Sequence, residues 1–138
     1  MQPQKCYAVN MTGDAKQIGR SGEDMAVKYL KTKGYDILDR NFYISSSCLD
    51  KGGIDIVAKK DGVIIFVEVK TLEDSDSPFS PEEKANWRKQ RKLARLGQFW
   101  LNQNRMALDV PWQIDIIAIK INRTDKRAQI NHFKNAVS

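Results

Sequence analysis

Two apolar segments joined by Asp61-Gly62 constrain the fold of this chain more than any other feature. Residues 63–70 read Val-Ile-Ile-Phe-Val-Glu-Val-Lys, so this segment is β-branched or aromatic except at its charged end. Such a run predicts a strand that is buried on both faces. Asp-Gly between two apolar segments is a strong signal for a two-residue turn. The sequence therefore predicts an antiparallel β-hairpin over residues 53–70.

The turn determines which residues of the hairpin face one another. With a two-residue loop, the numbers of cross-strand partners sum to 123, so Ala58 faces Ile65. The same register places Asp55 opposite Glu68 on one face, with Cβ atoms about 5 Å apart. Lys70 shares that face, about 7 Å further along the strand. A longer loop or a bulge would move Asp55 out of line with Glu68.

Charged side chains in an apolar hairpin need a physical reason. Burial of an unpaired charge is costly, and like charges that face each other destabilise a sheet. A cation between Asp55 and Glu68 would remove both costs, and Mg²⁺ binds a few carboxylates together with waters. Lys70 could then orient an attacking water or stabilise charge on a phosphate. The alternative is a solvated Glu68–Lys70 pair at a strand end, with Asp55 as an ordinary edge charge.

The size and composition of the chain limit its class. A chain of 138 residues fits one domain, and we expect a flexible tail over 1–14 followed by a single domain over 15–138. No apolar run reaches the roughly 18 residues of a membrane span, and no secretion signal is visible. Cys6 and Cys48 lack metal-ligand spacing, which favours free thiols and a cytoplasmic location. The single histidine, His132, excludes His-based zinc sites and Ser-His-Asp catalysis, so we expect for it a structural role or none.

Periodicity predicts the remaining elements. A helical apolar face recurs over 15–33 and ends at Gly34. Further strands are expected at 35–42, 112–121 and 128–133, with turn-rich segments at 44–53 and 71–80. Ser80-Pro81 followed by Glu83 predicts the start of a second helix that runs to about residue 104. The order α-β-β-β-α-β-β predicts an α/β fold in which helices flank a mixed sheet of four or five strands.

The excess positive charge is concentrated in the second predicted helix. The chain has 23 basic and 17 acidic residues and a net charge of +6. Residues 81–105 contain seven basic and two acidic residues and therefore carry +5 of that charge. Steps of three and four residues place five of them in one stripe: Lys84, Arg88, Arg91, Lys92 and Arg95. Such a stripe is typical of a surface that binds the nucleic-acid backbone, and the alternative is a solvated helix face.

These motifs, in this order, resemble the YraN-like family. Its members are poorly characterised bacterial proteins of the PD-(D/E)XK nuclease superfamily, similar to Holliday-junction resolvases. The resemblance covers roughly residues 18–120 and rests chiefly on Gly22-Glu23, Asn41, Gly52-Gly53-Ile54-Asp55 and the Phe-Val-Glu-Val-Lys-Thr segment at 66–71. It implies a restriction-endonuclease-like three-layer core and an endonuclease that needs Mg²⁺ or Mn²⁺ and cuts branched or structured DNA. It also implies that Asp55 and Glu68 bind the metal, that Lys70 is the catalytic lysine, and that Glu23 is a further catalytic acid.

The chain departs from the family pattern at two positions. The family usually carries Glu where this chain has Gly53, and often Arg where it has Leu72. On the predicted register Gly53 faces Lys70, so the lysine loses an acidic neighbour. Three hypotheses stay open: an endonuclease, a non-catalytic nucleic-acid-binding module on the same scaffold, and a structural protein whose buried charges are paired. Nothing in the chain reads bases, which favours recognition of DNA shape, and an enzyme that cuts two strands usually acts as a homodimer.

Overall fold

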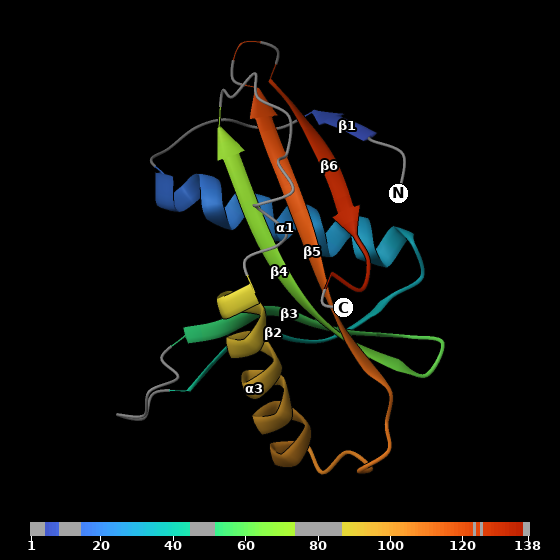
Figure 1. Cartoon of the computed structure of the whole chain (residues 1–138). Coiled ribbons are helices and arrows are strands. Elements are labelled where there is room, and N and C mark those ends of the chain that lie inside the picture. The colour runs from blue at the N-terminus through green and yellow to red at the C-terminus, as the bar shows by residue number, and fades with distance from the viewer. Residues whose placement is uncertain are drawn as a thin grey trace.

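The strands of this chain form one sheet with a helix on each face. The computed structural model describes residues 5–8, 15–44, 52–73, 87–122, 124 and 126–136. The sheet has six strands in the order β1-β6-β5-β4-β3-β2, with α1 behind it and α3 in front in the view of Figure 1. The described elements, in chain order, are β1 (Lys5–Ala8), α1 (Ala15–Thr32), β2 (Asp36–Ile44), β3 (Gly52–Lys60), β4 (Val63–Glu73), α3 (Trp87–Gln103), β5 (Trp112–Asn122) and β6 (Arg127–Phe133).

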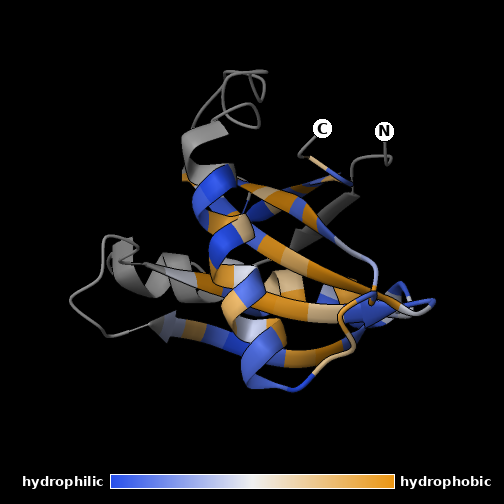
Figure 2. Cartoon of the chain, turned by 60° about the horizontal axis from the view of Figure 1, so that its bottom comes forward, coloured by the Kyte–Doolittle hydropathy of each residue, from blue (hydrophilic) through white to orange (hydrophobic). Residues whose placement is uncertain are grey.

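Alternate residues of β4 belong to the two apolar layers. Ile65 and Val67 belong to the core beneath α1, whereas Ile64 and Phe66 belong to the core beneath α3. All four are at most 3% exposed, as expected for a strand buried on both faces. Figure 2 shows hydrophobic residues along the central strands and many hydrophilic residues on α3. The predicted three-layer α/β core of restriction-endonuclease-like type is therefore confirmed, and odd-numbered residues of β4 face α1.

The β3–β4 hairpin turns at Asp61 and Gly62, as predicted. Both residues have positive φ, 52° and 79°, which is the backbone conformation that a tight type I′ turn requires. The ladder contains the pairs Lys60↔Val63, Ala58↔Ile65 and Ile56↔Val67, whose numbers have the predicted sum. The predicted register is therefore confirmed over the length of this ladder.

The sheet is mixed, as the sequence predicts. Strands β4 and β5, which α3 connects, run parallel, and the other neighbouring strands are antiparallel. One strand was not predicted: Lys5–Ala8, placed by the sequence in a tail, pairs with β6 at the edge of the sheet. Its four residues, Lys-Cys-Tyr-Ala, are too few to show a period, so pattern alone cannot reveal a strand that depends on backbone hydrogen bonds to a distant segment.

Several predicted boundaries differ from the structure. Strand β4 continues to Glu73, because Thr71, Leu72 and Glu73 pair with β5, whereas the sequence placed them in a turn-rich segment. The predicted helix start at Ser80-Pro81 lies outside the described residues. Helix α3 ends at Gln103, close to the predicted end. No helix in the part of the chain that the structure describes is long and apolar enough to cross a membrane.

Candidate metal and nucleic-acid site

The polar residues predicted from the hairpin lie where β3 and β4 separate. The pair Ile56↔Val67 is the last in their ladder, and beyond it β3 continues beside β2 while β4 continues beside β5. Asp55 and Glu68 are the next residues of the two strands. The Asp55 carboxylate turns toward β4, where Oδ2 accepts a 2.8 Å hydrogen bond from the Val69 backbone N–H. We call this point, where β3 and β4 separate at Asp55 and Glu68, the fork. Here the Asp55 carboxylate oxygen accepts a hydrogen bond that a backbone carbonyl of the neighbouring strand would accept in a regular sheet.

An irregularity shared by β2 and β3 turns the Asp55 side chain out of the normal alternation. The β2–β3 pairs Arg40↔Ile56 and Phe42↔Ile54 flank Asp55. Ile54 belongs to the core beneath α3 and Ile56 to the core beneath α1, although residues two apart in a regular strand share a face. Between Arg40 and Phe42, Asn41 has a φ of 54°, a left-handed conformation that Asn tolerates better than most residues. No residue pattern in the sequence predicts this irregularity.

Glu68 and Lys70 lie on the α3 side of the sheet. Their neighbours Val67 and Val69 pack in the layer beneath α1, so strand alternation places Glu68 and Lys70 on the opposite face. Glu68 is only 9% exposed, and Lys70 is partly buried. A carboxylate at that depth is stable only with hydrogen-bonding or charged partners. The exposed ion pair that the sequence left as an alternative therefore does not describe Glu68.

Glu23 lies in the opposite layer. A Cβ at Gly22 would collide with the Thr71 side chain, so this glycine allows α1 to approach the end of β4 closely. Glu23 follows Gly22 and is partly buried. Because α1 covers the face opposite to Glu68 and Lys70, Glu23 lies in the layer on the other side of the sheet from them.

The site contains few acidic side chains that could bind a metal ion. Within the described ranges, no group of three or more His, Cys, Asp or Glu side chains gathers that could hold a metal ion. Mg²⁺ is commonly held by one or two carboxylates together with waters and substrate phosphates, whereas structural Zn²⁺ sites use four protein ligands. The pair Asp55 and Glu68 therefore fits Mg²⁺ or Mn²⁺ better than a metal that needs a full protein cage.

The missing acid at Gly53 has a packing explanation. Gly53 pairs with Tyr43 on β2, and Tyr43 is 64% exposed. A Cβ at Gly53 would lie 2.5 Å from the Tyr43 ring and 2.7 Å from the Phe42 carbonyl oxygen. Any side chain at this position would have to displace both the ring and the β2 backbone. Tyr43 thus occupies the space that a larger residue at position 53 would need.

Helix α3 presents part of the predicted basic stripe. Arg91 and Arg95 are exposed and lie one turn apart, while Lys92 is partly buried. The predicted apolar side of the helix is confirmed by Leu93 and Leu96, which are 4% and 1% exposed. Lys84 lies outside the described residues, and Arg88 belongs to α3 without a described side chain. The arginines and the Glu68–Lys70 face therefore lie on the same side of the sheet.

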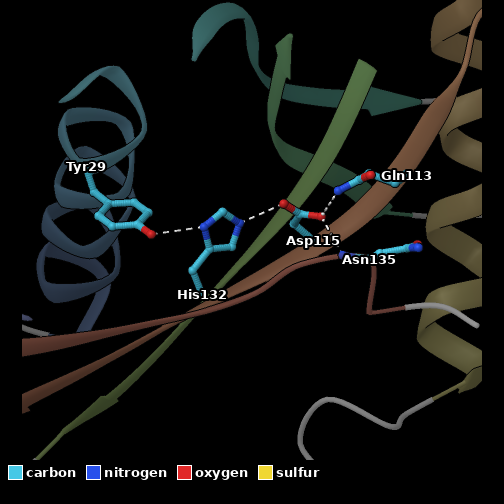
Figure 3. A network of polar contacts seen from close by, with 5 residues as sticks. All are labelled: Tyr29, Gln113, Asp115, His132 and Asn135. Atoms are coloured by element: carbon cyan, nitrogen blue, oxygen red, sulfur yellow. Dashed lines mark hydrogen bonds and ion pairs between the residues drawn. The ribbon is translucent and has the colours of Figure 1, made fainter. Parts of the chain in front are cut away.

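A buried polar network, which the sequence pattern did not predict, connects α1 with β5 and β6 (Figure 3). His132 Nε2 lies 2.7 Å from Asp115 Oδ2, and His132 Nδ1 lies 3.0 Å from the Tyr29 hydroxyl. The Gln113 side-chain amide and the Asn135 backbone N–H donate to Asp115 Oδ1 at 2.8 and 2.9 Å. Because a carboxylate only accepts, the geometry assigns a proton to Nε2, and Nδ1 of a neutral ring accepts from Tyr29.

This network has a structural role. Asp115 is 0% and His132 3% exposed, so neither can touch a substrate. Tyr29 belongs to α1, Asp115 to β5 and His132 to β6, and their contacts therefore join the helix to two strands. This agrees with the structural role expected for His132. The one available signal was Asp115 itself, a carboxylate inside the apolar segment 112–121.

The fold and the polar fork together define an α/β protein of restriction-endonuclease-like architecture. The chain belongs to the Uncharacterised protein family UPF0102, whose family model matches residues 22–119. A UPF0102 protein of Alkaliphilus oremlandii is 40% identical over 121 residues, which are 88% of this chain and 97% of that protein. A UPF0102 protein of Roseiflexus castenholzii is 34% identical over 127 residues, 92% of this chain and 98% of that protein. These matches confirm the resemblance to the YraN-like family.

Proposed function

We propose that this protein is a metal-dependent endonuclease that hydrolyses phosphodiester bonds in DNA. The observation that carries the proposal is the fork, where the Asp55 carboxylate is fixed against the Val69 N–H beside Glu68. A carboxylate pair followed by a lysine at the end of a buried hairpin conflicts with the apolar pattern of both strands. Such conflicts are concentrated at functional sites.

Each polar residue of the fork has a role in the proposed reaction. Asp55 and Glu68 hold a Mg²⁺ or Mn²⁺ ion, which when bound neutralises charge on the scissile phosphate. The Val69 N–H holds Asp55 in one orientation, so the ligand is positioned before the substrate arrives. Lys70 donates hydrogen bonds to the attacking water or to the phosphate, on the face of the sheet that α3 flanks. Glu23, on α1, is the further catalytic acid that the family resemblance implies.

The proposed substrate is branched or structured DNA. Arg91 and Arg95 lie on the same side of the sheet as Lys70 and would neutralise DNA phosphates. Such contacts determine the affinity for DNA and the position of the protein along it, but they do not read the base sequence. The basic stripe of the second helix carries most of the excess charge of the chain. Recognition of shape follows from backbone contacts, and cleavage of two strands at a junction would require a homodimer.

One observation favours a second candidate, a non-catalytic nucleic-acid-binding module. The Tyr43 ring occupies the space that a side chain at position 53 would need, so a glutamate at this position would require the ring or the backbone to move. A site with fewer acids binds a cation more weakly. In this alternative α3 still binds DNA, but the residues of the fork do not catalyse cleavage.

A cleavage experiment separates the two candidates. Labelled four-way junctions and linear duplexes of the same sequence are incubated with the protein in Mg²⁺ or Mn²⁺, beside a Glu68→Gln variant of nearly the same shape. The enzyme is supported by junction cleavage that needs the metal and disappears in Glu68→Gln. Salt-sensitive binding without cleavage supports the module, and the absence of both contradicts both candidates.

A further inference from the structure

A buried oxygen without a hydrogen-bond partner lies in β6. Asn131 is 5% exposed, and its side-chain Oδ1 is fully enclosed without any partner. A buried acceptor that lacks a donor is destabilising, and native proteins contain few of them. The position therefore needs an explanation other than stability.

Strand pairing places Asn131 in the same cross-strand row as Lys70. Lys70 pairs with Ala118 in the parallel β4–β5 ladder, and Ala118 pairs with Asn131 in the antiparallel β5–β6 ladder. Directly paired residues point to the same face of a sheet, so all three side chains lie on the α3 side. The row spans two strand spacings, about 10 Å, and the residue between the two polar side chains is only an alanine.

The buried polar network does not account for Asn131. The adjacent residues Ile130 and His132 face the layer beneath α1, where His132 contacts Tyr29. Asn131 points the other way, toward the face that holds Glu68 and Lys70. Its oxygen therefore belongs with the residues of the fork rather than with the network.

We infer that Asn131 is a positioning residue for Lys70. Its carboxamide oxygen has no partner in the structure, and it accepts a hydrogen bond when the Lys70 side chain extends across Ala118. This contact holds the ammonium on the face that carries Glu68. The flexible four-carbon stem of lysine can reach across the alanine, and an ammonium has three donors. One donor satisfies Asn131 and two stay available for water and phosphate. The catalytic consequence rests on the proposed function, whereas the contact itself is a property of the free protein.

The contact is tested by NMR of lysine ammonium groups in ¹⁵N-labelled protein without DNA. A hydrogen-bonded ammonium is held in place and exchanges slowly with water, so it gives an observable signal. We expect one signal that Lys70→Arg removes and that Asn131→Val also removes, whereas Asn131→Asp, which keeps the acceptor, retains it. The matched control is Gln129→Val, on the same strand and face and paired with Lys120 in the next row. A Lys70 signal that is absent in the wild type, or unchanged in Asn131→Val, would overturn the inference.

The functional consequence is tested with the same variants. Thermal unfolding shows first that Asn131→Val is folded. Its turnover on junction DNA should fall by at least about tenfold at unchanged KM, as expected when the support of an active-site group is removed. Asn131→Asp should restore most of the turnover. Wild-type turnover in Asn131→Val contradicts the inference, whereas an inactive wild type contradicts only the proposed function, and the NMR result then decides the contact alone.

Discussion

Asp55 accepts a 2.8 Å hydrogen bond from the Val69 backbone N–H, and this contact joins β3 to β4 just beyond the last pair of their ladder, Ile56↔Val67. The carboxylate therefore has a structural task that depends on its oxygen and a proposed chemical task that depends on its charge. Substitutions can separate these tasks, because asparagine keeps the acceptor and loses the charge.

Asp55→Asn should preserve the fold, and Asp55→Ala should not do so to the same extent. The alanine leaves the Val69 N–H without its acceptor, which costs about 1–3 kcal/mol of unfolding free energy, whereas the asparagine should cost less than about 1 kcal/mol. Both variants should lose Mn²⁺ binding in calorimetric titrations. Urea denaturation measures the stability difference. Equal destabilisation by the two substitutions would show that the hydrogen bond to Val69 contributes nothing.

The Tyr29–His132–Asp115 network should show a graded response to substitution. Asp115→Ala removes the acceptor of three contacts and should lower the unfolding free energy by about 3 kcal/mol or more. Tyr29→Phe removes one contact and should cost about 0.5–1.5 kcal/mol. The phenylalanine retains the edge-on ring contact with His132, at 5.5 Å between centroids. Urea denaturation at neutral pH compares the two, and similar losses would contradict the central role of Asp115.

The sequence predicted the hairpin well because its information is local. Asp61-Gly62 allows little besides a tight turn, and the apolar pattern then determines the partners of residues up to Ile56. The direction of the Asp55 side chain could not be predicted, because regular alternation is broken there: Ile54 and Ile56 belong to opposite layers, and Asn41 on the neighbouring strand has a left-handed backbone. The contacts of His132 could not be predicted from the sequence either, since Tyr29 lies 103 residues away in the chain. Contacts between distant segments depend on strand order, which periodicity does not reveal.

Gly53 and Tyr43 should behave as a coupled pair. Gly53→Glu introduces a Cβ against the Tyr43 ring and the Phe42 carbonyl oxygen, and overpacking of this kind costs about 1–3 kcal/mol. In the double variant with Tyr43→Ser the ring is absent, so the loss should be smaller than the sum of the two single losses by more than about 0.5 kcal/mol. A double-mutant cycle in urea measures this coupling. Additive losses would mean that the ring moves away freely and that Tyr43 does not restrict position 53.

The exposed arginines of α3 should determine the salt dependence of DNA binding. Replacement of Arg91 and Arg95 by glutamine removes two cations, and the slope of log affinity against log salt should become shallower by about 1.8. The matched control replaces Lys28 and Lys31, two exposed lysines of α1, by glutamine. Fluorescence anisotropy at several salt concentrations gives the slopes. Equal slopes for the two double variants would show that DNA does not bind on the α3 side.

Tyr35 should make the fold less stable at high pH. Its side chain is 5% exposed, and its pKa is raised above the ordinary value of 10.0 by burial and by the negative charges of Asp115 and Asp61. Above about pH 10 the unfolded chain releases the phenolic proton while the folded chain retains it, so stability falls as the pH rises toward the folded-state pKa.

Tyr35→Phe keeps the ring under the Lys60 ammonium, 4.8 Å from the ring centroid, and removes only the hydroxyl. The difference in unfolding free energy between wild type and Tyr35→Phe should therefore be constant between about pH 7 and 9 and shift in favour of the variant above about pH 10. Urea denaturation across this range measures it, and a difference that stays constant to about pH 11 would show that the Tyr35 proton is not held more tightly in the folded protein.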